Sequence, residues 1–160
     1  MERPVPKIRL FGYGSLMSEK NLRARAPSAQ PVAWARASGW RAFFAKVGTN
    51  HVYLTIAPTG GELDITFGRL IDVDPPALAV LAQHEPGYRL VDVTDAIRDA
   101  GERETTFAFI AEVEPIPPAK ARIKRSYINK CMAELPLEIR EEWLARWVAI
   151  PEGVTIDEDA

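Results

Sequence analysis

The pattern of apolar and polar residues predicts several strands in the first part of the chain. An apolar run over Lys7–Tyr13 and an aromatic-rich run over Trp40–Val47 both have strand character. After Val52–Ile56, a turn signal at Pro58–Gly61 leads into alternating apolar positions that continue to Ile71. We therefore expect the chain from Val52 to Ile71 to form a β-hairpin.

The middle of the chain is predicted to contain one helix and two more strands. Asp74 is a helix cap and Pro75 suits the first helical position, so a helix begins there and ends before Pro86. Strand patterns follow over Tyr88–Thr94 and Thr105–Ala111, with a polar loop between them.

Helical spacing dominates the last part of the chain. Apolar residues recur every fourth position from Ile123 to Leu135, and Leu137–Ile150 is interpreted as a second helix. Because strands come first and helices last, we predict an α+β fold with a mixed sheet. Residues 1–160 are interpreted as a single domain, with a core over about 7–150 and a frayed acidic tail over 151–160.

Composition narrows the classes of function. The chain has 160 residues, is 47% hydrophobic and carries a net charge of −2, which suits a globular domain and gives no support to nucleic-acid binding. Cys131 is the only cysteine, so an internal disulfide is impossible and a reducing, cytoplasmic location is expected. No signal peptide or membrane-length apolar run is present, so no membrane partner is expected; the oligomeric state stays open, a homodimer included.

The turn after the first strand is the first stretch that suggests chemistry. Gly12 and Gly14 are separated by one residue and followed by Ser15, and a short helix is expected from Ser18 to about Ala26. Glycines at a strand-to-helix turn let backbone N–H groups approach a ligand, and a helix N-terminus favours negative charge. The turn could bind a carboxylate or phosphate, or it could be a packing turn, and the motif alone does not separate these alternatives.

A second stretch places a carboxylate between a helix and a strand. Glu85 follows the expected end of the helix, and Pro86-Gly87 then turns the chain into the next strand. Such a carboxylate can be held at the rim of the core. The alternative is an ordinary surface carboxylate beside a turn.

Three other features of the sequence could indicate a site. Ser15 could be a nucleophile, but the stretch lacks the closing glycine of Gly-x-Ser-x-Gly and only His51 and His84 could serve as bases. Two histidines and one cysteine far apart match no metal-ligand spacing. The basic residues between Lys120 and Lys130 are interpreted as a solvated helix face.

Motifs in three places together resemble the γ-glutamylcyclotransferase superfamily. They are Tyr13-Gly14-Ser15-Leu16 after a strand, Glu85-Pro86-Gly87-Tyr88 between a helix and a strand, and Tyr127 followed by Leu135-Pro136-Leu137-Glu138. The resemblance extends from about Ile8 to Ile150. It implies a small mixed fold, with a compact β-barrel or sheet, surrounding helices and a pocket at one end.

The resemblance also implies a reaction and a site. In this family a γ-glutamyl amide is cleaved when the substrate's own α-amine attacks its γ-carbonyl, which gives pyroglutamate (5-oxoproline) and a free amine. Glu85 would be the general acid and base, and neither a metal nor a cofactor would take part. The residues expected to bind the substrate are Tyr13, Gly14, Ser15, Leu16, Tyr88 and Tyr127.

The proton transfer requires Glu85 to have a raised pKa. An α-amine has a pKa near 8 and an unperturbed glutamate one near 4.3, so an ordinary carboxylate is a poor base for it. A pKa raised by about two units would remove roughly 2.7 kcal/mol of this mismatch. Burial raises the pKa of a carboxyl, and the apolar neighbours in sequence are Leu81, Pro86 and Tyr88.

The leaving group and the activity both have alternatives at this point. The run Phe11–Met17, with Leu16 where the loop of the cyclotransferase usually has asparagine, resembles the glutathione-specific branch, whereas the C-terminal motif resembles the cyclotransferase itself. The substrate could be glutathione, a γ-glutamyl amino acid or a γ-glutamyl amine. A second hypothesis is a module that binds a small carboxylate without turnover.

Overall fold

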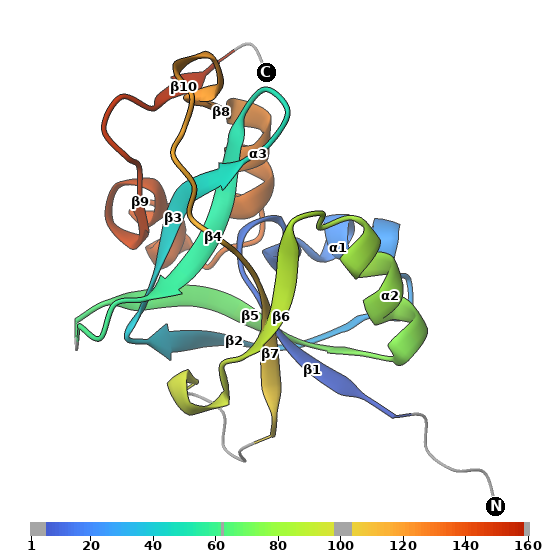
Figure 1. Cartoon of the computed structure of the whole chain (residues 1–160). Coiled ribbons are helices and arrows are strands. Elements are labelled where there is room, and N and C mark those ends of the chain that lie inside the picture. Colours follow the sequence, from blue (N-terminus) through green and yellow to red (C-terminus); the bar gives the residue numbers. More distant parts are fainter. Residues whose placement is uncertain (1–5, 62, 98–103, 159–160) are drawn as a thin grey trace, which may run out of the picture.

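A computed structural model, which describes residues 6–61, 63–97 and 104–158, has the mixed α+β architecture predicted from the sequence (Figure 1). Its strands are β1 (Ile8–Gly12), β2 (Gln30–Ser38), β3 (Trp40–Val47), β4 (Val52–Pro58), β5 (Ile65–Val73), β6 (Tyr88–Asp92), β7 (Thr106–Ala111), β8 (Arg122–Lys124), β9 (Val148–Ala149) and β10 (Thr155–Asp157). The helices are α1 (Glu19–Arg25), α2 (Pro75–Gln83), α3 (Arg125–Met132) and α4 (Leu137–Arg140). Shorter helical turns are the 3-10 turns η1 (Gly14–Met17), η2 (Thr94–Ala96) and η3 (Pro118–Lys120), and the π-helical turn η4 (Trp143–Trp147).

The described strands pair into open sheets rather than into one closed barrel. The larger sheet has the order β2-β5-β1-β7-β6, and a second sheet has the order β4-β3-β9. β1 is antiparallel to β5 and parallel to β7, so the larger sheet is mixed. A short parallel pair, β10 and β8, completes the strand pairing.

The expected hairpin from Val52 to Ile71 is wrong. β4 pairs with β3, and β5 pairs with β2 and β1, so the two strands belong to different sheets. The loop between β4 and β5 is bound to Gly39, the residue between β2 and β3. The Gly39 carbonyl accepts from the N–H of Thr59 at 2.8 Å, and its N–H donates to the backbone carbonyl of Asp64 at 2.8 Å. Alternation along a strand determines which side chains share a face, but it leaves the partner strand undetermined.

β2 was not predicted, although its pattern alternates. Ala35 and Ala37 are fully buried while Arg36 between them is exposed. Alanine has low strand propensity, and Pro31 lies at the start of the strand, next to an irregularity in its pairing with β5. The small side chains therefore gave no strand signal, although β2 pairs with β5 along most of its length and contributes Ala35 and Ala37 to the core.

The C-terminal helices are shorter than predicted. α3 begins only at Arg125, because Ile123 lies in β8, and Asp157 of the expected tail is paired with that strand in β10. The predicted helix over 137–150 contains α4 and η4, and then Val148 pairs with Ala42 of β3. Strand pairing with the edge of the second sheet replaces the last helical turn.

The expected cap at Asp74 is present, and Ser18, the expected start of the first helix, is a cap as well. Ser18 accepts from the N–H of Asn21 at the start of α1, and Asp74 accepts from the N–H of Ala77 at 2.8 Å at the start of α2. Each cap supplies an acceptor for one of the first N–H groups of its helix, which have no partner inside the helix. The polar loop predicted over 95–104 lies partly outside the described residues.

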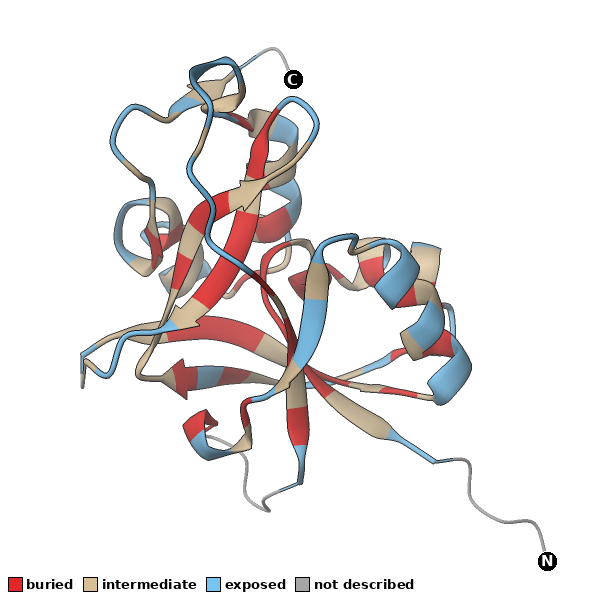
Figure 2. Ribbon diagram, viewed as in Figure 1, coloured by how far each residue is buried: buried red, intermediate tan, exposed pale blue. Residues whose placement is uncertain are grey.

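Two apolar cores meet near the centre of the molecule (Figure 2). One lies between the two sheets, α3 and η4, with Phe44, Leu54 and Trp143 among its members. The other lies where α1 and α2 cover the larger sheet, and it includes Leu22 and Leu81. η1 contributes Met17 to the first core and Leu16 to the second, so this turn separates them.

One buried threonine links the two sheets. The hydroxyl of Thr55 on β4 donates to the carbonyl of Ala111 on β7 at 3.2 Å and accepts from the N–H of the same residue at 2.9 Å. Thr55 is fully buried, so neither group of Ala111 can turn to water if the hydroxyl is lost.

We predict that Thr55→Val destabilises the protein by about 1–3 kcal/mol, because two buried backbone groups lose their partner. Thr66→Val is the matched control, since the equally buried Thr66 hydroxyl has no hydrogen-bond partner among the described residues. That variant is expected to be neutral or stabilising. Urea denaturation of both variants measures the difference, and equal destabilisation would contradict the link between the sheets.

Candidate functional site

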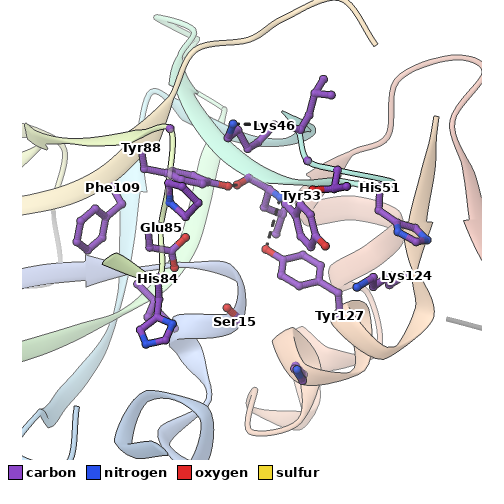
Figure 3. Close-up of a pocket in the computed structure, with 18 of the residues that line it drawn as sticks. Ser15, Lys46, His51, Tyr53, His84, Glu85, Tyr88, Phe109, Lys124 and Tyr127 are labelled. Atoms are coloured by element: carbon purple, nitrogen blue, oxygen red, sulfur yellow. Dashed lines mark hydrogen bonds between the residues drawn. The ribbon is translucent and has the colours of Figure 1, made fainter. Parts of the chain in front are cut away.

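A pocket of about 1030 Å³ opens where η1, the end of α2, β4 and α3 come together (Figure 3). Six of the seven residues predicted for the site line it: Tyr13, Ser15, Leu16, Glu85, Tyr88 and Tyr127. Gly14 lies behind them, beside Tyr127. The structure thus brings together the three motifs, which are far apart in the sequence.

The glycine turn is shaped by two close approaches. Gly14 has φ +63°, and a Cβ atom there would stand 2.9 Å from the hydroxyl oxygen of Tyr127. A Cβ on Gly12 would stand 2.6 Å from the side chain of Ile71. Close packing therefore explains why glycine is needed at both positions. The turn also begins the 3-10 helix η1, and the first N–H groups of this helix have no acceptor within it. The two interpretations of the turn are compatible.

Glu85 lies at the rim between the two cores, just after α2. Its side chain is 17% exposed, and its Oε1 atom is 3.6 Å from the guanidinium of Arg25 on α1. Burial raises the pKa of the Glu85 carboxyl to about 7, although the Arg25 charge acts in the opposite direction. In Figure 3 this carboxylate and the Ser15 hydroxyl face the space in front of Tyr127. Glu85 is therefore a largely buried carboxylate at the rim of the core, with a strongly raised pKa, rather than an ordinary surface carboxylate.

The backbone of Leu54 on β4 anchors two of the predicted tyrosines. The Tyr88 hydroxyl donates to the Leu54 carbonyl at 2.6 Å, and the Leu54 N–H donates to the Tyr127 hydroxyl at 3.4 Å. The Tyr13 hydroxyl donates to the carbonyl of Phe109 on β7. Burial raises the pKa of all three phenols above the ordinary value, so they remain protonated.

The remaining candidate chemistries find no support in the geometry. Within the described residues, His51 is hydrogen-bonded to Asp157 at 3.0 Å, and neither histidine is hydrogen-bonded to Ser15. A serine nucleophile would need such a base. No group of three metal-ligating side chains occurs in the searched part of the chain. Among the helices of that same part, none is long and apolar enough to cross a membrane.

The sequence did not reveal that a set of cations surrounds the pocket. The basic segment 120–130 was interpreted as a solvated face, yet three of its lysines line the cavity, together with two cations from elsewhere: Arg25, Lys46, Lys120, Lys124 and Lys130. The only carboxylate in the lining is Glu85. Only the tertiary structure brings β3, β8 and α3 around one cavity, so no local signal could have identified this group.

The arrangement has the parts that acyl transfer within one substrate requires. A carboxyl with a pKa near neutrality can take up and return a proton. The Tyr127 hydroxyl and the start of η1 can donate hydrogen bonds to an anionic oxygen. Cations around the cavity favour a negatively charged ligand.

Solved structures with the same fold were found. A γ-glutamyl cyclotransferase aligns with a TM-score of 0.69 at 20% identity, covering 96% of this chain and 95% of its own. An uncharacterised human protein aligns with a TM-score of 0.65 at 22% identity over the same shares. YkqA from Bacillus subtilis reaches 0.70 at 19% identity, over 91% of this chain and 55% of its own. At these identities the likeness shows the fold.

A match between this sequence and a protein-family model identifies the family. No curated protein has a significantly similar sequence. The model of a family described as "Gamma-glutamyl cyclotransferase, AIG2-like" matches residues 10–127, a range that contains the glycine turn, Glu85 and Tyr127. Because this match spans most of the chain, the protein belongs to the AIG2-like γ-glutamyl cyclotransferase family.

Proposed function

We propose that this protein is a γ-glutamylcyclotransferase that releases pyroglutamate from a γ-glutamyl amide, with Glu85 as the general acid and base. The observation that carries the proposal is the Glu85 carboxyl, which faces the pocket and whose pKa is raised to about 7. The family match and the neighbour of known name supply the reaction class. The reaction needs no protein nucleophile, and no histidine is hydrogen-bonded to Ser15 in the described residues.

The chemical step begins with proton transfer. The ionised Glu85 carboxylate takes a proton from the α-ammonium of the substrate, whose pKa is near 8, so the two groups are almost matched. The freed amine nitrogen attacks the γ-carbonyl carbon, and a new C–N bond closes the five-membered ring. Because both reacting groups belong to one molecule, holding it folded supplies an effective molarity that can reach about 10⁵ M or more.

The second half of the step breaks the original amide. Attack on the γ-carbonyl places negative charge on its oxygen, which the N–H groups at the start of η1 and the Tyr127 hydroxyl, an acceptor from Leu54 that still has its own proton to donate, can stabilise. Glu85, now protonated, donates its proton to the nitrogen of the leaving amine, and the old C–N bond breaks. The regenerated carboxylate then takes the second proton from the ring nitrogen, which gives the neutral lactam, and this proton passes to the released amine. The products are pyroglutamate and a free amine, and Glu85 returns to its ionised form.

The direct test is product formation. The protein is incubated with glutathione and with panels of γ-glutamyl amino acids and γ-glutamyl amines, and pyroglutamate is measured by chromatography. Pyroglutamate from at least one compound is expected. No product from any compound would refute the enzymatic proposal. Ligand-induced thermal stabilisation without product would instead favour a module that only binds small carboxylates.

Glu85→Gln is predicted to lower the rate of pyroglutamate release by about 10²–10⁴-fold, because the amide cannot exchange protons with the substrate. Glu152→Gln, at an exposed carboxylate outside the pocket, is the control and should keep the wild-type rate. Circular dichroism checks that both variants are folded. Full activity in Glu85→Gln would exclude this residue as the base.

The pH profile should depend on Arg25. The fraction of ionised Glu85 rises with pH through about 7, so kcat/KM should increase across that range. Arg25 lowers the pKa of Glu85, and Arg25→Gln is therefore predicted to raise this pKa and move the acid limb of the profile to higher pH.

Arg23→Gln serves as the control for this shift. Arg23 is on the same helix but forms its ion pair with Glu19, outside the pocket. The α-ammonium of the substrate titrates identically in all three proteins, so a difference between their profiles belongs to the enzyme. An acid limb that does not move in Arg25→Gln would contradict the assignment.

A further inference from the structure

The pocket carries far more positive charge than the molecule as a whole. The net charge of the chain is −2, yet five cations and one carboxylate line the cavity. Arg25 is 3.6 Å from Glu85, so these two charges largely offset each other. Four lysines remain, and we call them the lysine arm: Lys46, Lys120, Lys124 and Lys130.

The basic segment 120–130 divides into two groups with different surroundings. Its two arginines pair with carboxylates of the C-terminal segment: Arg122 lies 3.7 Å from Asp157, and Arg125 forms a two-pronged pair with Glu158 at 2.8 and 2.9 Å. Neither arginine lines the pocket. The lysines of the same segment line it, and among the described residues none of them forms an ion pair. Asp157 also contacts His51 of the lining at 3.0 Å, and neither Asp157 nor Glu158 is itself among the lining residues.

Lys46 approaches the same cavity from another direction. It lies near the end of β3, and its ammonium group is so close to Gly87 that a Cβ there would stand 2.6 Å from Nζ. Its hydrogen bond goes to the carbonyl of Val47 at 3.3 Å, and no carboxylate of the described residues pairs with it. Four ammonium groups around one cavity repel each other, and a bound anion relieves this repulsion.

Part of the lysine arm lies away from the reacting end. In Figure 3, Lys124 and Glu85 stand on opposite sides of Tyr127, whereas Lys46 reaches the turn after Glu85, where its Nζ lies against Gly87. A glutamyl group bound between η1 and Glu85 would direct its amide substituent toward these lysines. The cavity of about 1030 Å³ is at the upper end of the range for drug-sized ligands, roughly 300–1,000 Å³, so a large substituent fits.

We infer that the lysine arm binds the leaving amine and that this amine carries at least two carboxylates, as in the γ-glutamyl derivative of glutamate or of an acidic peptide. This inference rests on the proposed function and narrows its substrate class. One carboxylate uses one or two ammonium groups, so four lysines that have no ion pair within the described part of the chain suit more than one anionic group. A cationic leaving amine, such as a γ-glutamyl polyamine would release, is disfavoured by the same charges.

The first experiment compares two nearly isosteric dipeptides, γ-glutamyl-glutamate and γ-glutamyl-glutamine. We expect kcat/KM to be about tenfold higher for the glutamate compound at low salt, mainly through KM, because one extra carboxylate gains one or two partly exposed ion pairs. Added sodium chloride should reduce the preference by screening. Equal kcat/KM values for the two compounds would overturn the inference.

The second experiment removes the lysines. Lys124→Gln with Lys130→Gln should abolish most of the preference for γ-glutamyl-glutamate, and it should lower kcat/KM for γ-glutamyl-glutamine less, because that compound has one carboxylate fewer for the lysines to bind. Arg122→Gln with Arg125→Gln removes the same amount of charge outside the pocket and is the matched control, expected to keep the preference. A preference that persists in the lysine variant, or disappears equally in the arginine variant, would overturn the inference.

A binding measurement separates this inference from the proposed function. Calorimetry with the Glu85→Gln protein reports the affinity for both dipeptides without turnover. Tighter binding of γ-glutamyl-glutamate supports the lysine arm even if wild-type protein releases no pyroglutamate, and equal affinities reject it even if the protein is an active cyclotransferase.

Discussion

The two hydrogen bonds to the backbone of Leu54 are the interaction on which the site depends. The Leu54 carbonyl accepts from Tyr88, which follows the Glu85 turn, and its N–H donates to Tyr127 on α3. Leu54 is itself fully buried in β4, and its neighbour Thr55 joins this strand to β7. One strand therefore connects the carboxylate side and the helical side of the pocket.

The position of Tyr127 explains why the opposite wall is a glycine turn. Its hydroxyl oxygen lies 2.9 Å from where a Cβ of Gly14 would be, so only glycine leaves room for it. Gly14 also has φ +63°, which side chains other than glycine rarely tolerate. Packing and backbone conformation thus both require glycine at this position. Burial by both cores at this point is also what raises the pKa of the Glu85 carboxyl.

The basic residues of segment 120–130 divide between the pocket and the surface outside it. Carboxylates of the C-terminal segment pair with Arg122 and Arg125 on the outer side, which leaves the lysines of the same segment for the cavity. Lysine suits such a role, because a compact ammonium on a flexible stem can follow ligands of different shape. An acidic protein thereby presents a basic pocket, and its overall charge says little about its ligand.

The sequence by itself determined the local structure and the chemistry of the key residues. Alternation identified most strands, Ser18 and Asp74 marked the helix starts, and the motifs around Gly14 and Glu85 pointed to one family. These features depend on neighbours in the chain. The tertiary structure alone decided that β4 pairs with β3 and that Lys46 shares a cavity with Lys124. Strand partners, burial and clustered charge depend on contacts between distant segments, which periodicity does not encode.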